Sequence, residues 1–131
     1  MALNTAGQTR TGNAPGADAN GFKVGRIVLD ATAITAGDYL LVECGFTPKY
    51  VSFVNNTTLI QVEWYEGMTA DTCLKTTGST GVVTLETTNK GITICDSSGV
   101  ANTEGRCFMV SQNATLGVVT SSDTMHFVAL G

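Results

Sequence analysis

The chain is short of charged groups. Only 14% of its 131 residues are Asp, Glu, Lys or Arg, against about 25% in an average soluble domain. Its seven basic residues form no stripe, which argues against binding to a nucleic-acid backbone. No apolar run approaches the roughly 20 residues of a membrane span. So few charges are typical of a surface covered by partners, or of one kept soluble by neutral polar groups.

Groups that carry out catalysis are also scarce. The chain has a single histidine, His126, and no glycine motif that would cradle a phosphate or a dinucleotide. Glu63 and Glu66 are three residues apart, a spacing that puts them on opposite faces of a strand. A general base needs a positioned nucleophile and an orienting acid, and the sequence nominates neither. We therefore expect no enzymatic activity, no metal and no cofactor.

The four cysteines, Cys44, Cys73, Cys95 and Cys107, are far apart in the sequence. None forms the short Cys-x-x-Cys pair that usually marks a zinc site. The N-terminus has no basic start followed by an apolar stretch, so we expect no secretory signal and synthesis in a cytoplasm. Small buried thiols are then the favoured interpretation, ahead of a disulfide and of a metal site.

What the sequence does contain, from Phe22 onward, is a series of short strands. The predicted strands cover residues 25–30, 39–44, 49–54, 59–65, 72–76, 82–87, 92–96, 107–111 and 124–130, with a further short strand at 117–119. Turn residues separate them about every 8–12 positions, and no window shows helical spacing. The polar turn at 55–58 predicts a β-hairpin. The pattern predicts an all-β fold, a jelly-roll-like β-sandwich in preference to a closed barrel, formed as a single domain by residues 22–131.

Residues 1–21 differ in composition from the rest of the chain. Leu3 is their only large apolar residue, so this segment cannot bury enough surface to fold by itself. Two interpretations stay open. The segment is either a disordered tail or an extended arm that becomes ordered on a neighbouring subunit, with Leu3 and Arg10 as its anchors.

A few side chains of the body suit a contact surface. Trp64 continues the core-facing alternation of its strand, so Tyr65 points away from the core, beside Met68. Tyr and Met are enriched in interfaces, although a Tyr lying on its own sheet is an equal alternative. His126 faces outward or into a contact if its two neighbours face the core. The candidate interface residues are Leu3, Arg10, Phe22, Tyr65, Met68 and His126.

One ordered series of motifs carries a resemblance. Residues 50–56 read YVSFVNN and residues 62–68 read VEWYEGM, followed by LKT at 74–76, LET at 85–87 and GIT at 91–93. This series, over residues 50–95, resembles a family of small virion proteins of tailed phages. The chain is also similar in size and composition to capsid cement, or decoration, proteins.

The resemblance implies a head-associated β-sandwich on the capsid exterior of a virion, made in the cytoplasm of the bacterial host. Its implied partners are the major capsid protein and other copies of itself, as a dimer or trimer, with neither nucleic acid nor membrane. A tail or fibre component and a small carbohydrate-binding module are the alternatives. The strand at 124–130 ends the chain, so we expect it to form a sheet edge that such contacts would cover.

Overall fold

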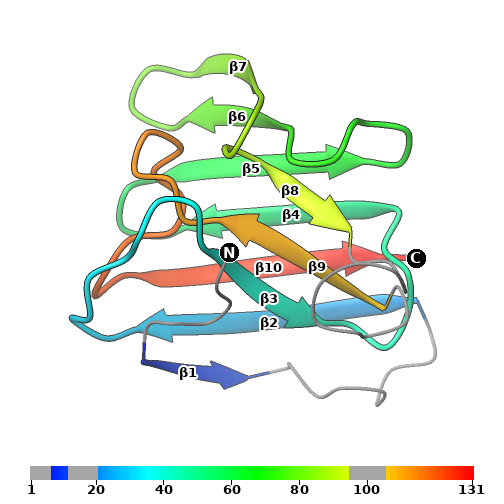
Figure 1. Cartoon of the computed structure of the whole chain (residues 1–131), viewed down its shortest axis with the longest axis horizontal. Coiled ribbons are helices and arrows are strands. Elements are labelled where there is room, and N and C mark those ends of the chain that lie inside the picture. Colours follow the sequence, from blue (N-terminus) through cyan, green and yellow to red (C-terminus); the bar gives the residue numbers. More distant parts are fainter. Residues whose placement is uncertain (1–6, 12–20, 95–105) are drawn as a thin grey trace.

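The computed structural model describes residues 7–11, 21–94 and 106–131, which form two antiparallel β-sheets (Figure 1). The larger sheet contains, in spatial order, β1 (Gln8–Thr11), β2 (Phe22–Leu29), β10 (Thr124–Leu130), β4 (Tyr50–Asn55), β5 (Ile60–Tyr65), β6 (Cys73–Thr77) and β7 (Val82–Glu86). The smaller sheet contains β3 (Tyr39–Glu43), β9 (Cys107–Ser111) and β8 (Ile92–Ile94). No described residue is helical. The predicted all-β sandwich is confirmed.

The core lies between the two sheets because each strand of the large sheet buries every second residue. This alternation is strict in β2, β4 and β10. Phe53 on β4 and Phe127 on β10 point toward the small sheet, where they meet Phe108 on β9. All five residues of β9 are buried, as expected for a strand covered on both faces.

Strands β4 to β7 follow one another as neighbours in space, which makes this half of the large sheet a meander. The predicted hairpin at 55–58 is confirmed, because β4 pairs with β5 in a register that places Tyr50 opposite Tyr65. The jelly-roll connectivity is not confirmed, since these four consecutive strands share one sheet.

Strand β10 is not an edge of the sheet. It pairs with β2 on one side and with β4 on the other, so the prediction of an edge at 124–130 is wrong. Met125, Phe127 and Ala129 are all buried in the core, as suits a central strand. The end of a chain has no fixed place in a sheet, and position in the sequence was therefore a poor guide. The outermost described strands of the large sheet are β1 and β7.

The side chain of Asn55 ties the β4–β5 turn to the loop that precedes β10. Its Nδ2 donates to the carbonyl oxygen of Val118 and to side-chain oxygens of Thr120 and Asp123, at 3.0–3.1 Å. Its Oδ1 accepts two backbone N–H groups of the following turn, at 2.7 and 2.9 Å. Asn55 is fully buried, and these bonds use both ends of its amide, as burial of a polar group requires.

Part of the N-terminal segment belongs to the large sheet. Residues 8–11 form β1, which pairs antiparallel with β2 and places Arg10 opposite Ile27. Leu3 lies outside the described residues, as do the rest of 1–6 and all of 12–20. The extended arm, and the division of the chain at residue 21, stay predictions.

The cysteines follow the sequence-based interpretation only in part. Cys44 and Cys73 are buried thiols outside any disulfide, as predicted. Burial, together with the nearby charge of Glu86, raises the pKa of Cys73 to about 12. Cys107 is disulfide-bonded, so the buried-thiol prediction is wrong for this residue. Spacing along a sequence does not reveal which cysteines meet in space. Cys95 lies outside the described residues.

Candidate interaction face

We call the side of the large sheet that points away from β3, β9 and β8 the outer face. Figure 1 shows the small sheet lying over one side of the large sheet. The strand register places the outer-face side chains in rows across the strands. The first row, from β2 to β5, is Phe22, Leu130, Tyr50 and Tyr65. The second row, from β2 to β7, is Val24, Val128, Ser52, Glu63, Leu74 and Leu85. The third row is Arg26, His126, Val54, Gln61, Thr76 and Val83.

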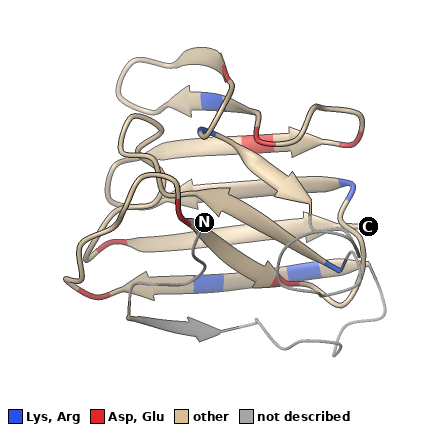
Figure 2. Ribbon diagram, in the orientation of Figure 1, with Lys and Arg blue, Asp and Glu red and all other residues tan. Residues whose placement is uncertain are grey.

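The first row of the outer face is entirely aliphatic or aromatic, and four of the six residues of the second row are aliphatic, where a solvated sheet would be polar. The third row is mostly polar. Phe22 and Val24 keep 53% and 50% of their surface exposed, and Tyr65 and Leu85 keep 45% and 61%. Arg26 and Glu63 are the only Lys, Arg, Asp or Glu residues in the three rows. β4 and β10 contain none at all (Figure 2). One-sided antiparallel sheets normally alternate apolar-in with polar-out, so the exposed apolar side chains of the first two rows indicate an interaction site.

A cluster of two tyrosines and one glutamate stiffens the first two rows. The hydroxyl groups of Tyr50 and Tyr65 both donate to Oε2 of Glu63, at 2.8 and 3.2 Å, and their ring centroids are 5.1 Å apart. Burial, and then Glu63, raises the pKa of Tyr50, while the charge of Glu63 raises the pKa of the exposed Tyr65. The cluster therefore offers fixed aromatic rings to a partner at little cost in side-chain entropy.

His126 lies in the third row with an exposed ring. Its Nδ1 is 2.6 Å from Oδ1 of Asn56, within hydrogen-bonding distance. Gln61, also in the third row, donates from Nε2 to Oγ of Ser52 in the second row at 2.9 Å. These contacts orient the polar side chains along the sheet surface. They form no pair of nucleophile and base.

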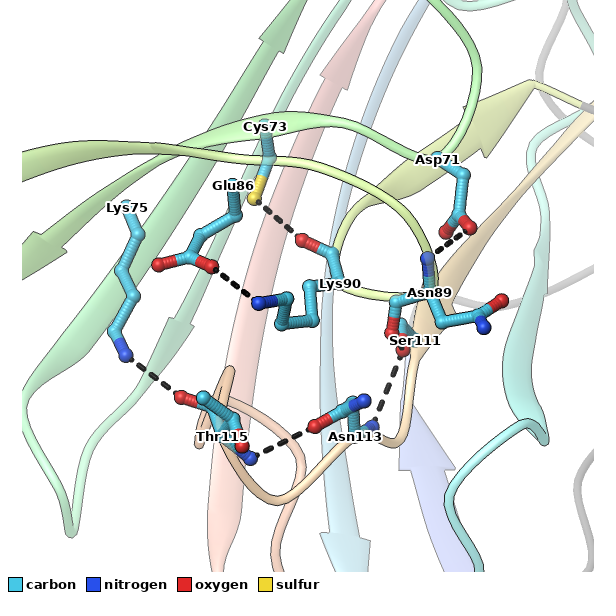
Figure 3. Close-up of polar contacts among 9 residues, drawn as sticks. All are labelled: Asp71, Cys73, Lys75, Glu86, Asn89, Lys90, Ser111, Asn113 and Thr115. Carbon is cyan, nitrogen blue, oxygen red and sulfur yellow. Dashed lines mark hydrogen bonds and ion pairs between the residues drawn. The ribbon is translucent and has the colours of Figure 1, made fainter.

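The β6–β7 hairpin is anchored to the rest of the sandwich on its inner side (Figure 3). Nζ of Lys75 on β6 donates to the carbonyl oxygen of Thr115 at 2.9 Å. Glu86 on β7 forms an ion pair with Lys90 at 3.6 Å, and Sγ of Cys73 lies 3.5 Å from the carbonyl oxygen of Lys90. These contacts hold β7 in place as an extended strand.

The chain passes from β7 to β8 through a tight crossover between the two sheets. The backbone N–H of Asn89 donates to Oδ2 of Asp71, and Oγ of Ser111 donates to the carbonyl oxygen of Asn89, each at 2.5 Å (Figure 3). A Cβ at Gly91 would lie 2.3 Å from the backbone nitrogen of Thr72, so only glycine fits at this crossing. The crossover joins the meander to the small sheet.

The structure brings together three of the six candidate interface residues. Phe22, Tyr65 and His126 all lie on the outer face. Met68 lies in the turn after β5, where its Sδ accepts the N–H of Tyr65 at 3.3 Å and its side chain packs partly against the core. Arg10 belongs to the edge strand β1, and Leu3 lies outside the described residues.

Sequence reasoning missed the apolar residues at both ends of the outer face. Val24 and Leu130 lie at one end, with Val83 and Leu85 at the other, and all four are exposed. A signal for them was present. In 22–28 and in 82–85, apolar residues occur at inward-facing and at outward-facing positions of the strand. This pattern is typical of a strand that is covered on both faces when the protein is assembled with its partners.

The described residues show no group of three His, Cys, Asp or Glu side chains that could hold a metal ion. Nor does any helix in the described part of the chain have the length and apolar character needed to span a bilayer. Comparison of the chain with protein-family models, with curated proteins and with solved structures finds no match.

Proposed function

We propose that the protein is a structural virion protein that binds the exterior of a phage capsid. In this proposal it stabilises the shell by bridging neighbouring capsid subunits, as a cement or decoration protein. The observation that supports the proposal best is the outer face of the sandwich, whose first two rows are mostly apolar and contain one charged residue, Glu63. The resemblance over residues 50–95 points to a phage head, and that segment builds β4 to β8.

The stabilisation of the shell by bound copies of the protein follows from mass action. A protein that binds only the assembled arrangement of two capsid subunits adds its binding free energy to the stability of that arrangement. Each copy needs no more than a modest interface, of about 800 Å² on each partner, because many copies act on one shell. A rigid sheet suits this role since it loses little conformational freedom on binding.

The anchors of the contact would lie in the first two rows of the outer face. Aromatic residues dominate the binding energy of most interfaces, and the first row presents Phe22, Tyr50 and Tyr65. Val24 in the second row is the apolar neighbour of Phe22 along β2 and is half exposed. We place the capsid contact on this end of the face.

Co-sedimentation with phage heads assembled without this protein tests the proposal. The wild-type chain is expected to sediment with the heads and to raise the temperature at which they break open. Val24→Lys places a charge in the middle of the contact and should abolish sedimentation. Leu59→Lys is the matched control, because Leu59 is equally exposed, at 58%, but lies in the β4–β5 turn. It should sediment as the wild type does.

Two results would contradict the proposal. One is a wild-type chain that does not sediment with heads. The other is a Val24→Lys variant that is folded, as judged by its circular dichroism and melting temperature, and still sediments normally. Immunogold labelling of virions distinguishes the remaining readings, since a signal on the tail would indicate a tail or fibre component. Binding to a glycan array would indicate a carbohydrate-binding module.

A further inference from the structure

We infer that β7 is a self-association edge, through which two copies of the chain pair antiparallel, β7 against β7, into one continuous sheet. The inference extends the proposed function, in which copies associate, by naming the strand and its register. It needs only the purified protein for its test, so it can fail or succeed independently of capsid binding.

The first argument is the composition of the edge. β7 pairs only with β6 among the described strands, and its residues Val82, Val83 and Leu85 are 55–61% exposed. Monomeric proteins protect such edges with lysine, proline, a bulge or inward-pointing charge. β7 reads VVTLE, with no lysine or proline, and its one inward-pointing charge, Glu86, lies at its end and is paired with Lys90. The opposite edge, β1, reads QTRT and is polar.

The second argument is self-complementarity. A two-fold axis through Thr84 is the only one that pairs all five residues of β7 with the second copy. It places Thr84 opposite Thr84 of the second copy and Val83 opposite its Leu85. Thr–Thr and aliphatic pairs are favourable cross-strand neighbours, and Val83 and Leu85 both lie on the outer face.

The same register avoids electrostatic repulsion. Glu86, the one charged residue of β7, falls opposite Val82 of the second copy and not opposite another glutamate. It also keeps its ion pair with Lys90 of its own chain. Like charges that face each other destabilise strand pairing. This register avoids such a pair, so the charge of Glu86 is compatible with pairing through β7.

The third argument is that the strand is already formed before it pairs. Gly81 has a φ of +71°, a conformation that suits glycine, and its N–H donates to the carbonyl oxygen of Thr77 at 2.7 Å to close the β6–β7 turn. The inner-side contacts of Lys75 and Glu86 fix the hairpin further. Little ordering entropy is then lost when two such edges meet.

Cysteine cross-linking tests the register. Thr84→Cys places two thiols directly opposite each other, at the Cβ separation of roughly 4.5–5.5 Å found in cross-strand pairs. It should give a disulfide-linked dimer on mild oxidation. Val83→Cys places its thiol opposite Leu85, with the second thiol on a diagonal of about 7–8 Å, too far for a bridge without backbone movement. It should not cross-link, whereas Val83→Cys combined with Leu85→Cys should. The wild type, treated identically, controls for the native cysteines.

Sedimentation velocity gives the second measurement. The wild type and Val24→Lys should be dimers, while Val83→Lys, which puts a charge on the paired edge, should be a folded monomer. A wild type that is monomeric at every concentration would overturn the inference, as would a Val83→Cys variant that cross-links as readily as Thr84→Cys. A dimer that does not bind heads would overturn only the proposed function. A monomer that binds them would overturn only this inference.

Discussion

The ring of Phe108 on β9 meets the ring of Phe127 on β10 edge-on across the space between the two sheets. Their centroids are 5.7 Å apart and their planes lie at 70°. Phe53 completes the cluster, with centroids 6.5 Å from both rings. These three fully or almost fully buried rings join the layers of the sandwich, and contacts of this geometry contribute beyond simple burial.

Phe108→Ala should lower the free energy of unfolding by about 3–5 kcal/mol, because it removes a buried ring and leaves a cavity between the sheets. Phe108→Leu, which keeps most of the volume, should cost clearly less. Urea denaturation of both variants and the wild type gives the comparison. A loss below about 1 kcal/mol for the alanine variant would show that the small sheet is not held by this cluster.

Asn55→Ala should destabilise the fold by about 2 kcal/mol or more, because the buried donors and acceptors that the amide serves lose their partners. Asn55→Asp keeps the shape and the acceptor for the turn but sets a second carboxylate beside Asp123. Its melting temperature should therefore recover as the pH falls and one of the two carboxylates is protonated. The alanine variant should show no such recovery.

The three tyrosines should all titrate above the ordinary pKa of 10.0 in the folded protein. Burial and Asp71 raise the pKa of Tyr39, burial and Glu63 raise that of Tyr50, and the charge of Glu63 raises that of Tyr65. Phenolate absorbance measures the titration, with the urea-unfolded chain as the reference. Glu63→Gln should lower the pKa of Tyr65 and leave that of Tyr39 unchanged.

The same shifts predict how stability depends on alkaline pH. A raised pKa means that the folded state favours the protonated phenol. The contribution of the buried Tyr39 and of Tyr50 is therefore fully present below pH 10.0, and it is lost as the pH rises through their folded-state pKa values. Melting temperatures on either side of pH 10.0 measure the loss. In Tyr39→Phe this part of the pH dependence should become smaller.

Cys44 and Cys73 should resist alkylation by iodoacetamide at mildly alkaline pH while the chain is folded. Both are completely buried, and a pKa of about 12 leaves Cys73 almost entirely as the unreactive thiol. Peptide mapping after alkylation, with and without urea, measures each site. Rapid labelling of Cys73 in the folded chain would mean that the β6–β7 hairpin opens readily.

The strands of this protein could be predicted from the sequence because alternation is a local property. The bounds of β9 and β10 were predicted to the residue, and those of the other strands of the sandwich body to within about three. The short strand predicted at 117–119 is wrong, since these residues form no strand. Which strands pair with each other in the sheet is not a local property of the sequence. The pairing of β10 with both β2 and β4 depends on contacts 70 or more positions apart, and no pattern within 124–130 encodes it.

The candidate interaction face was predictable only in part, for a similar reason. Tyr65 and His126 could be assigned outward from the alternation of their own strands. Their place on one surface with Phe22 depends on the order of β2, β10, β4 and β5. The hydrogen-bonding role of Asn55 was also hidden, because an Asn-Asn-Thr-Thr turn reads as polar loop whether or not its first side chain is buried.

The one-sided position of the small sheet has a consequence for avidity. Pairing through β7 about a two-fold axis would leave both small sheets on one side of the joined sheet and both outer faces on the other. A pair of copies would then touch its target at two equivalent places at once, and a contact too weak to hold one copy would hold two. Binding to the capsid should therefore depend steeply on pairing through β7, although β7 itself makes no contact with the capsid.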